Sequence, residues 1–199
     1  PLQKLESGIE QVTDIQGKGK IWIIDDAFAL KNGAKPIGHT PFSINILTPK
    51  SGKVLFLTRP NVPEIIRFTL ATDDKKLRQS IRFTTLTIGT NDPMEVRLQK
   101  AVQIIEGRLA PRFYDGHKNG SIVKRYKTRI GPYDGVVMLG KLTTKEGNNL
   151  FIKFVGILPS NKSTGLVAVM LLDPKQYNKD SINKQLSDGY MQQVLHSVR

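Results

Sequence analysis

Short apolar runs broken by Gly, Pro and Asn dominate the chain from Ile21 onward, and this punctuation is typical of antiparallel strands. Before Asn91 the runs predict five strands, at residues 21–24, 43–47, 54–58, 65–71 and 80–88. The polar cluster at residues 73–76 separates the last two and suits a hairpin connection. In the fourth run Ile66 alternates with Arg67, so we expect one apolar and one solvated face.

A helix signal follows the fifth run. Asp92 can cap the helix, Pro93 suits its first position and Glu95 completes a variant of the capping box. Apolar residues then recur at intervals of three and four as far as Leu109. We expect Pro111 to stop this helix.

The second half of the chain repeats the order of strands followed by a helix. Four more runs predict strands at residues 122–130, 135–143, 150–158 and 166–172. A second helix is expected over residues 182–198, where Gly189 should weaken it by about 1 kcal/mol relative to Ala. Residues 166–172 are apolar at successive positions and residues 150–158 nearly so, which indicates that both faces of these strands are covered. The element order therefore predicts an α+β fold in which helices flank both sides of an antiparallel sheet.

The length of 199 residues suits one domain. Residues 1–20 have scattered charges and weak periodicity, so we expect a flexible N-terminal arm followed by a single α+β domain over residues 21–199. The chain starts at Pro1 without a basic and apolar leader, and we expect a processed, exported product. The most continuous apolar stretch, residues 166–172, is far shorter than the roughly 20 residues that cross a bilayer.

Three segments resemble the PsbP-like family, whose members carry an antiparallel sheet between helices. They are the helix at residues 92–109, the meander at 123–172 with Gly135-Val136-Val137 opening its second strand, and the terminal helix at 191–198. The resemblance spans about half the chain and implies a PsbP-like sandwich. It also implies the non-enzymatic accessory or assembly role of photosystem accessory proteins and exported bacterial relatives, and it transfers no catalytic or metal-binding residue.

Positive charge is concentrated in one segment. The chain has 30 Lys and Arg against 17 Asp and Glu, a net charge of +13, and seven of the cations lie between Arg108 and Arg129 with Asp115 as the one acid among them. Arg125, Lys127 and Arg129 are spaced by two, so they should project from one strand face at intervals of about 7 Å. We expect this basic face to bind an anionic partner. The predicted binding residues are Arg112, Lys118, Lys124, Arg125, Lys127 and Arg129.

Several anions would suit such a face: an acidic protein surface, a cell-envelope polymer or lipid headgroups. Nucleic acid is an alternative, because Phe113, Tyr114, Tyr126 and Tyr133 could stack on bases, although no helix-turn-helix, zinc-finger or RRM signature is present. In the simplest alternative the cations only solvate the strand or protect a sheet edge.

Signals for catalysis and metal binding are weak. Without Cys, these residues hold no disulfide, thiol nucleophile or thiolate metal site. His39, His117 and His196 stand at no ligand spacing, and neither a nucleophile elbow nor a phosphate-binding glycine loop occurs. We therefore expect no metal and no cofactor. The sequence leaves open whether four residues converge on a site: Asp25, Asp26, Asp115 and His117.

These patterns together predict a non-catalytic accessory or binding domain of an exported bacterial protein. We expect it in the periplasm or associated with the cell envelope, with the cytoplasm as the alternative. An enzyme whose site is assembled only in three dimensions is the other alternative.

Overall fold

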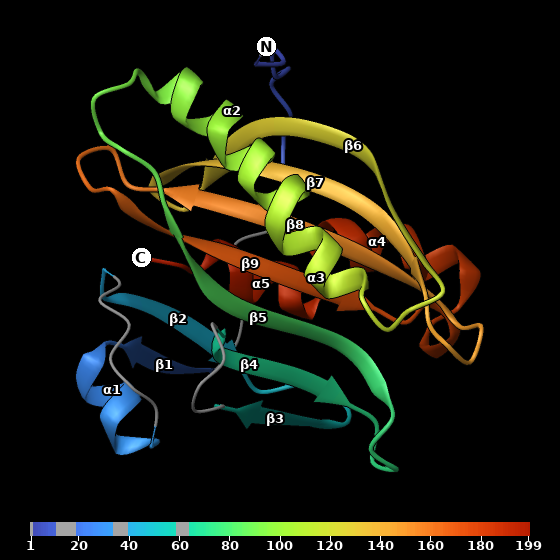
Figure 1. The fold of residues 1–199 in the computed structure, drawn as a ribbon. Coiled ribbons are helices and arrows are strands. Elements are labelled where there is room, and N and C mark those ends of the chain that lie inside the picture. Colours follow the sequence, from blue (N-terminus) through green and yellow to red (C-terminus); the bar gives the residue numbers. More distant parts are fainter. Residues whose placement is uncertain (1, 11–18, 34–39, 59–63) are drawn as a thin grey trace.

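A computed structural model describes residues 2–10, 19–33, 40–58 and 64–199 (Figure 1). These residues form a seven-stranded antiparallel sheet in the order β3-β4-β5-β9-β8-β7-β6 and a two-stranded sheet, β1-β2. The strands are β1 (Gly19–Ile24), β2 (Phe42–Leu47), β3 (Lys53–Leu57), β4 (Glu64–Ala71), β5 (Leu77–Thr87), β6 (Asn119–Ile130), β7 (Tyr133–Thr143), β8 (Asn149–Leu158) and β9 (Thr164–Leu172). All nine predicted strands are confirmed.

On β4, Ile66 and Phe68 are fully buried on one face, as the alternation predicts. The expected solvated face is corrected, because no residue of β4 is exposed and the Arg67 side chain, only 19% exposed, pairs with Glu64 at 2.7 Å. The continuous apolar runs of β8 and β9 are buried at nearly every position, because both faces of the central strands are covered.

One face of the large sheet is covered by a single helical segment in three parts: α2 (Met94–Ile104), the π-helix η1 (Ile105–Leu109) and α3 (Ala110–Tyr114). Figure 1 shows α2 lying across β6–β9. The core of this layer includes Leu98, Ala101, Ile105, Val136, Met138, Phe154 and Val167.

Two details of this segment correct the prediction. Pro111 does not end the helix, because the π-type turn directly before it lets α3 start afresh, and a proline in a first turn has no hydrogen bond to lose. The capping box is absent as well. Pro93 itself is the N-cap residue, and the Asp92 carboxylate accepts a hydrogen bond from Lys100 Nζ at 2.6 Å.

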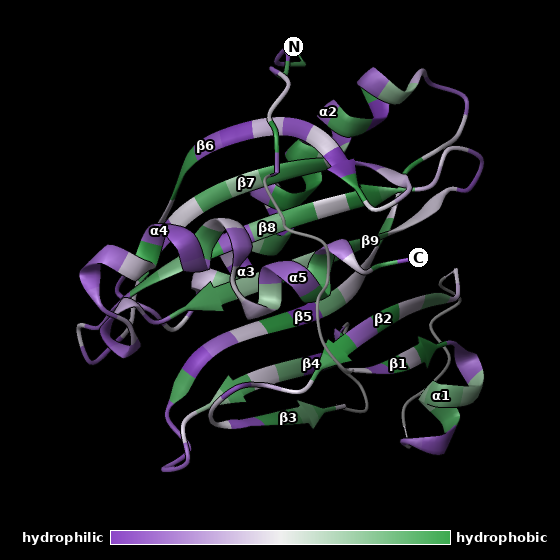
Figure 2. Ribbon diagram, turned by 180° about the vertical axis from the view of Figure 1, so that it is seen from behind, coloured by the Kyte–Doolittle hydropathy of each residue, from purple (hydrophilic) through white to green (hydrophobic). Residues whose placement is uncertain are grey.

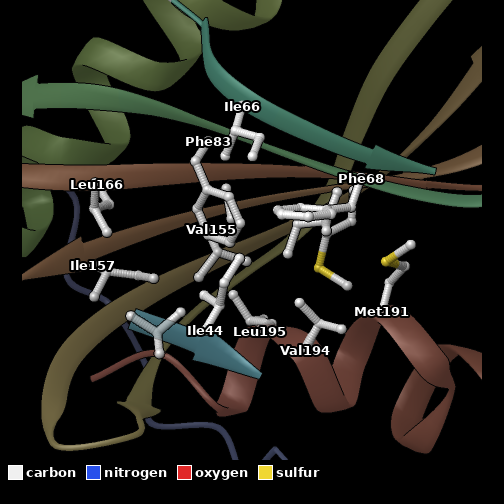
Figure 3. Packing of buried hydrophobic residues seen from close by; sticks show 14 of the residues in the cluster. Ile44, Ile66, Phe68, Phe83, Val155, Ile157, Leu166, Met191, Val194 and Leu195 are labelled. Carbon is white, nitrogen blue, oxygen red and sulfur yellow. The ribbon is translucent and has the colours of Figure 1, made fainter. Parts of the chain in front are cut away.

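The opposite face is covered by the β1-β2 sheet and by α5 (Tyr190–His196), with α4 (Lys179–Asp188) and the short 3-10 turn η2 (Pro174–Gln176) before it. Gly189 is extended, with φ −74° and ψ 176°, so the predicted terminal helix is two helices instead of one. Figure 3 shows Met191, Val194 and Leu195 of α5 pointing at Phe68 and Val155 of the sheet. The expected helices on both sides of the sheet are therefore confirmed.

A short helix, α1 (Asp26–Lys31), was not predicted. Asp25 is its N-cap residue and accepts a hydrogen bond from the Phe28 N–H at 2.8 Å. The adjacent carboxylates of Asp25 and Asp26 thus begin a helix.

Part of the expected N-terminal arm packs on the domain. Leu5 is buried, Gly8 N–H donates to the Lys127 carbonyl at 2.8 Å, and Lys127 N–H donates to the Glu6 carbonyl at 2.9 Å. Residues 2–10 therefore lie along the edge strand β6. Because residues 11–18 lie outside the described part of the chain, the boundary at residue 20 stays a prediction. Among the described residues, no helix has the length and apolarity needed to traverse a bilayer.

Candidate functional site

The cations spaced by two along β6 share one face, as alternation predicts, but that face carries the helical segment. Lys127 forms an ion pair with Glu95 of α2, and Arg125 forms one with Glu106 of η1. About a third of each cationic side chain stays exposed. Figure 2 shows that β6 is hydrophilic over most of its length, whereas β8 and β9 are mainly apolar.

Arg129, the third member of this row, pairs with Asp134 of β7 at 3.0 Å. The expected row of uncompensated cations on an open face is therefore corrected: each member has a carboxylate partner. Two of these acids come from the helical segment and the third comes from β7, so the spacing within β6 could not reveal them.

The other three predicted binding residues are exposed and form no ion pair with any described residue. Arg112 lies on α3 and Lys118 in the turn before β6. Lys124 belongs to the other face of β6, where its Nζ lies 5.5 Å from the centre of the Tyr126 ring. The structure therefore divides the six residues and leaves Arg112 and Lys118 at the α3–β6 connection.

Two further exposed cations join them at this end of the sheet. Arg108 precedes Arg112 by one helical turn. Lys145, from the β7–β8 turn, places Nζ 3.9 Å from the position that a Cβ on Gly116 would occupy. We call Arg108, Arg112, Lys118 and Lys145 the basic end. Neither Arg108 nor Lys145 is ion-paired to a described residue, although Asp115 and Glu146 are close in sequence.

The aromatic rings beside these cations are used in packing. Phe113 and Tyr114 make edge contacts with Phe154, at centroid distances of 5.9 and 6.1 Å. Tyr126 donates a hydrogen bond to Glu10, and Tyr133 packs against the core on the α5 side. All four rings are partly buried and pack against the core.

A cavity of about 370 Å³ lies on the other side of the sheet, between β5–β9 and the α4–α5 pair. Its floor includes Leu139, Met170 and Leu172, and Leu186 and Met191 approach from the helices.

At one end of the cavity Glu10 and Lys153 form a buried ion pair, with 2.7 Å between Oε2 and Nζ. Lys153 Nζ also donates to Gln192 Oε1 at 2.8 Å, and His196 Nε2 lies 3.2 Å from Glu10 Oε2. Gln192 Nε2 and the Tyr126 hydroxyl donate to the same carboxylate. The sheet, α5 and the N-terminal segment are thus joined at one point.

This environment determines the charge of each group. Burial alone would raise the pKa of Glu10, but hydrogen bonds from His196, Lys153 and Tyr126 and the charge of Lys153 outweigh it and lower that pKa to about 2. Burial lowers the pKa of Lys153, and the Glu10 carboxylate opposes this shift. Burial and the bond to Glu10 raise the pKa of Tyr126.

A second polar group inside the cavity is Gln79, which is 2% exposed. Its Nε2 donates to Tyr177 OH at 2.7 Å and to Gln185 Oε1 at 2.9 Å, and its Oε1 accepts from Met191 N–H at 3.1 Å. Every polar atom of this side chain therefore has a protein partner.

The residues that the sequence left open as a possible catalytic or metal site lie in two different parts of the fold. Asp25 caps α1, whereas Asp115 and His117 lie in the turn between α3 and β6. No group of three His, Cys, Asp or Glu that could hold a metal occurs among the described residues, and His39 lies outside them.

An antiparallel sheet between a long helix and a helix-containing second layer defines the class of the fold, an α+β sandwich. Within this class the fold is PsbP-like, as the sequence resemblance predicted. No protein-family model matches the chain, and no curated protein matches its sequence. Among solved structures, PsbP (CyanoP) of Synechocystis sp. PCC 6803 matches over 92% of this chain and 94% of its own, with 8% identity and a TM-score of 0.52.

Two other solved structures are also similar. The Ran-binding protein Mog1p of Saccharomyces cerevisiae has 12% identity over 92% of this chain and 96% of its own, with a TM-score of 0.48. LpqN of Mycobacterium tuberculosis, involved in cell envelope biogenesis, has 12% identity over 90% of each chain, with a TM-score of 0.49.

The cavity network was not found from the sequence. Its one available signal was Lys153, a cation inside an otherwise apolar strand, because such a residue needs a buried counterion. Nothing local identified Glu10 as that counterion.

Proposed function

We propose that this chain is a non-catalytic accessory domain that docks to an acidic protein surface through the basic end. One observation carries the proposal. The four cations of the basic end are exposed and unpaired to any described residue, whereas the cations of the β6 row have carboxylate partners. Exposed charges of one sign speed association with a surface of opposite sign.

The hydrogen-bonded group around Glu10 and Lys153 in the cavity does not have the properties of a catalytic site, so a binding role suits it better. Polar residues converge in a concave site, which is the arrangement an enzyme would need. However, Glu10 has a lowered pKa and accepts hydrogen bonds from several donors, so it is a poor general base. Lys153 is held by Glu10 and Gln192, so its amine is not free to act as a nucleophile.

An acidic protein is favoured over nucleic acid by the aromatic residues. Single-stranded nucleic acid is usually held by cations together with exposed rings. Here Phe113 and Tyr114 are packed against Phe154, and Tyr126 is bonded to Glu10. Of the two features of such a site, cations and exposed rings, the basic end therefore supplies the cations.

A salt titration with poly-L-glutamate, single-stranded DNA and vesicles containing phosphatidylglycerol tests the proposal. The test variant replaces the four cations of the basic end with Ser. The control variant replaces four exposed lysines elsewhere: Lys31, Lys50, Lys53 and Lys179. Both variants carry a net charge of +9, from +13 minus 4, so the overall field of the protein is matched.

We expect polyglutamate binding to weaken by about tenfold or more in the test variant and clearly less in the control, with a linear fall of log affinity against log salt. Equal losses in the two variants would refute the basic end. Preferential binding of DNA would favour the nucleic-acid alternative, and preferential binding of vesicles would favour lipid headgroups. Export to the periplasm or cell envelope, with the cytoplasm as the alternative, stays part of the proposal. Fractionation of cells that express the protein from its native gene tests it.

A further inference from the structure

The cavity between the sheet and the α4–α5 pair has the size and lining of a ligand site. Its volume of about 370 Å³ falls in the range of roughly 300–1,000 Å³ that small-molecule pockets occupy. Apolar side chains from the sheet and from both helices form most of its wall, including Leu139, Met170, Leu186 and Met191.

The polar groups inside the cavity are already paired with one another. Glu10 is neutralised by Lys153, and Gln79 is fully hydrogen-bonded to protein atoms. A ligand group with hydrogen-bonding needs would therefore find no open partner on these inner residues and would lose its hydration. The interior favours an apolar chain.

The mouth of the cavity has a different character. The lining residues that are exposed, and so lie at the opening, come from the N-terminal segment, β6, β7 and α4: Ile9, Val123, Lys141, Asn183 and Ser187. Lys141 supplies an ammonium group there, and Asn183 and Ser187 supply neutral donors. Glu10 is the one acid among the described lining residues, and Lys153 compensates its charge. The mouth therefore carries an uncompensated positive charge.

We propose that this cavity binds a single-chain amphiphile with an anionic head, such as a long-chain carboxylate. The apolar chain lies between Met170 and Met191, and the head lies at the mouth near Lys141. Ile9 and Val123, which are 87% and 63% exposed, cover the part of the chain that emerges from the interior. The site is independent of the basic end, whose α3 and η1 residues belong to the opposite face of the sheet.

The four methionines provide a direct test. Met170 and Met191 line the cavity, whereas Met94 and Met138 belong to the core beneath α2. In protein labelled with ¹³C at the methionine methyl groups, dodecanoate below its micellar concentration should shift the Met170 and Met191 resonances saturably. The Met94 and Met138 resonances should stay in place. Shifts of all four methyl groups together, or of none, would overturn the proposal.

The anionic head group of the proposed ligand is tested by comparing surfactants of opposite charge and by reversing the charge of Lys141. We expect dodecanoate to bind more tightly than dodecyltrimethylammonium, and Lys141→Glu to weaken dodecanoate by about three- to tenfold, the range expected for reversing one exposed charge. Lys50→Glu makes the same change in net charge on an exposed loop outside the cavity lining and should leave the affinity nearly unchanged. Equal affinity for the two surfactants, or equal effects of the two substitutions, would refute an anionic head at Lys141.

Discussion

The Glu10 carboxylate lies 2.7 Å from the Lys153 ammonium group, although 143 positions separate the two residues in the sequence. Glu10 comes from the N-terminal segment and Lys153 from the middle of β8, so the pair fastens that segment to the sheet. Both side chains are almost entirely buried, at 4% and 11% exposure. Because a buried charge without a partner is costly, each residue depends on the other.

This pair predicts a specific loss of stability in acid. The unperturbed pKa of the Glu10 carboxyl is 4.5, and its pKa in the folded protein is about 2. The contribution is fully present above pH 4.5 and is lost as the pH falls toward 2, because the unfolded chain takes up a proton that the folded protein resists. The difference between these two pKa values corresponds to about 3 kcal/mol in the free energy of unfolding. Urea unfolding at several pH values measures it.

Glu10→Gln should remove this contribution, so the gap between the two proteins should be about 3 kcal/mol at pH 7 and should shrink below pH 4.5. Glu6→Gln changes an exposed carboxylate of the same segment and is the matched control. A gap that stays constant from pH 7 to pH 2.5 would show that the Glu10 carboxylate is not paired.

Two ion pairs between β6 and the helical segment should stabilise the folded protein. Lys127 joins β6 to Glu95 of α2, and Arg125 joins it to Glu106 of η1. Because these pairs are partly exposed, we expect the double change to Ser at Arg125 and Lys127 to lower the free energy of unfolding by only about 1 kcal/mol. Lys124→Ser, which removes an unpaired cation of the same strand, should cost less. Thermal and urea unfolding of the three proteins would decide, and equal stability would show that the pairs are too weak to matter.

Strands were the most predictable part of this fold, because alternation and turn residues are local signals. The helices were less predictable where their course depends on distant contacts. The helix continues past Pro111 because η1 changes its hydrogen bonding, and the terminal helix divides at Gly189. The capping signal at Asp92 was misleading, since Lys100 binds that carboxylate and Lys127 binds Glu95.

The candidate site was less accessible to sequence reasoning than the fold. Spacing correctly placed Arg125 and Lys127 on one face, but the carboxylates opposite them lie in a segment whose position depends on the whole sheet. The cavity is formed by the sheet, α4, α5 and the N-terminal segment, so no local pattern encodes it. The sequence shows that Lys153 is charged, but it does not show that Glu10 lies beside it in the folded chain.

Close approach of the helical segment to β8 depends on Gly156. A Cβ placed there would lie 3.1 Å from Val136 Cγ1 and 3.3 Å from Ile105 Cδ1. Gly156→Val should therefore push η1 from the sheet and lower the free energy of unfolding by about 1–3 kcal/mol. Gly89→Val is the control, because a Cβ at Gly89 meets no described atom within 4 Å. Equal urea midpoints for the two variants would mean that the helix layer yields without cost.

Arg97 should be among the most sensitive positions of the helix layer. It projects from α2, is 1% exposed, and donates to the carbonyl groups of the β8–β9 loop: to Pro159 at 2.8 Å, Ser160 at 3.2 Å and Lys162 at 2.6 Å. No carboxylate is bonded to its guanidinium group among the described residues, so its charge is balanced by carbonyl dipoles.

Arg97→Met would keep an extended side chain but remove every donor, leaving these loop carbonyls without their partner. Hydrogen bonds to a charged group are individually worth about 1.5–3 kcal/mol, so we expect a loss of about 3 kcal/mol in the free energy of unfolding. The loop should also loosen, with faster hydrogen exchange at the Ile88 amide, which donates to Ser163 O at 2.7 Å. Gln103→Met, on the exposed side of α2, is the matched control. If Arg97→Met changed neither stability nor exchange more than Gln103→Met, the guanidinium group would not hold the loop.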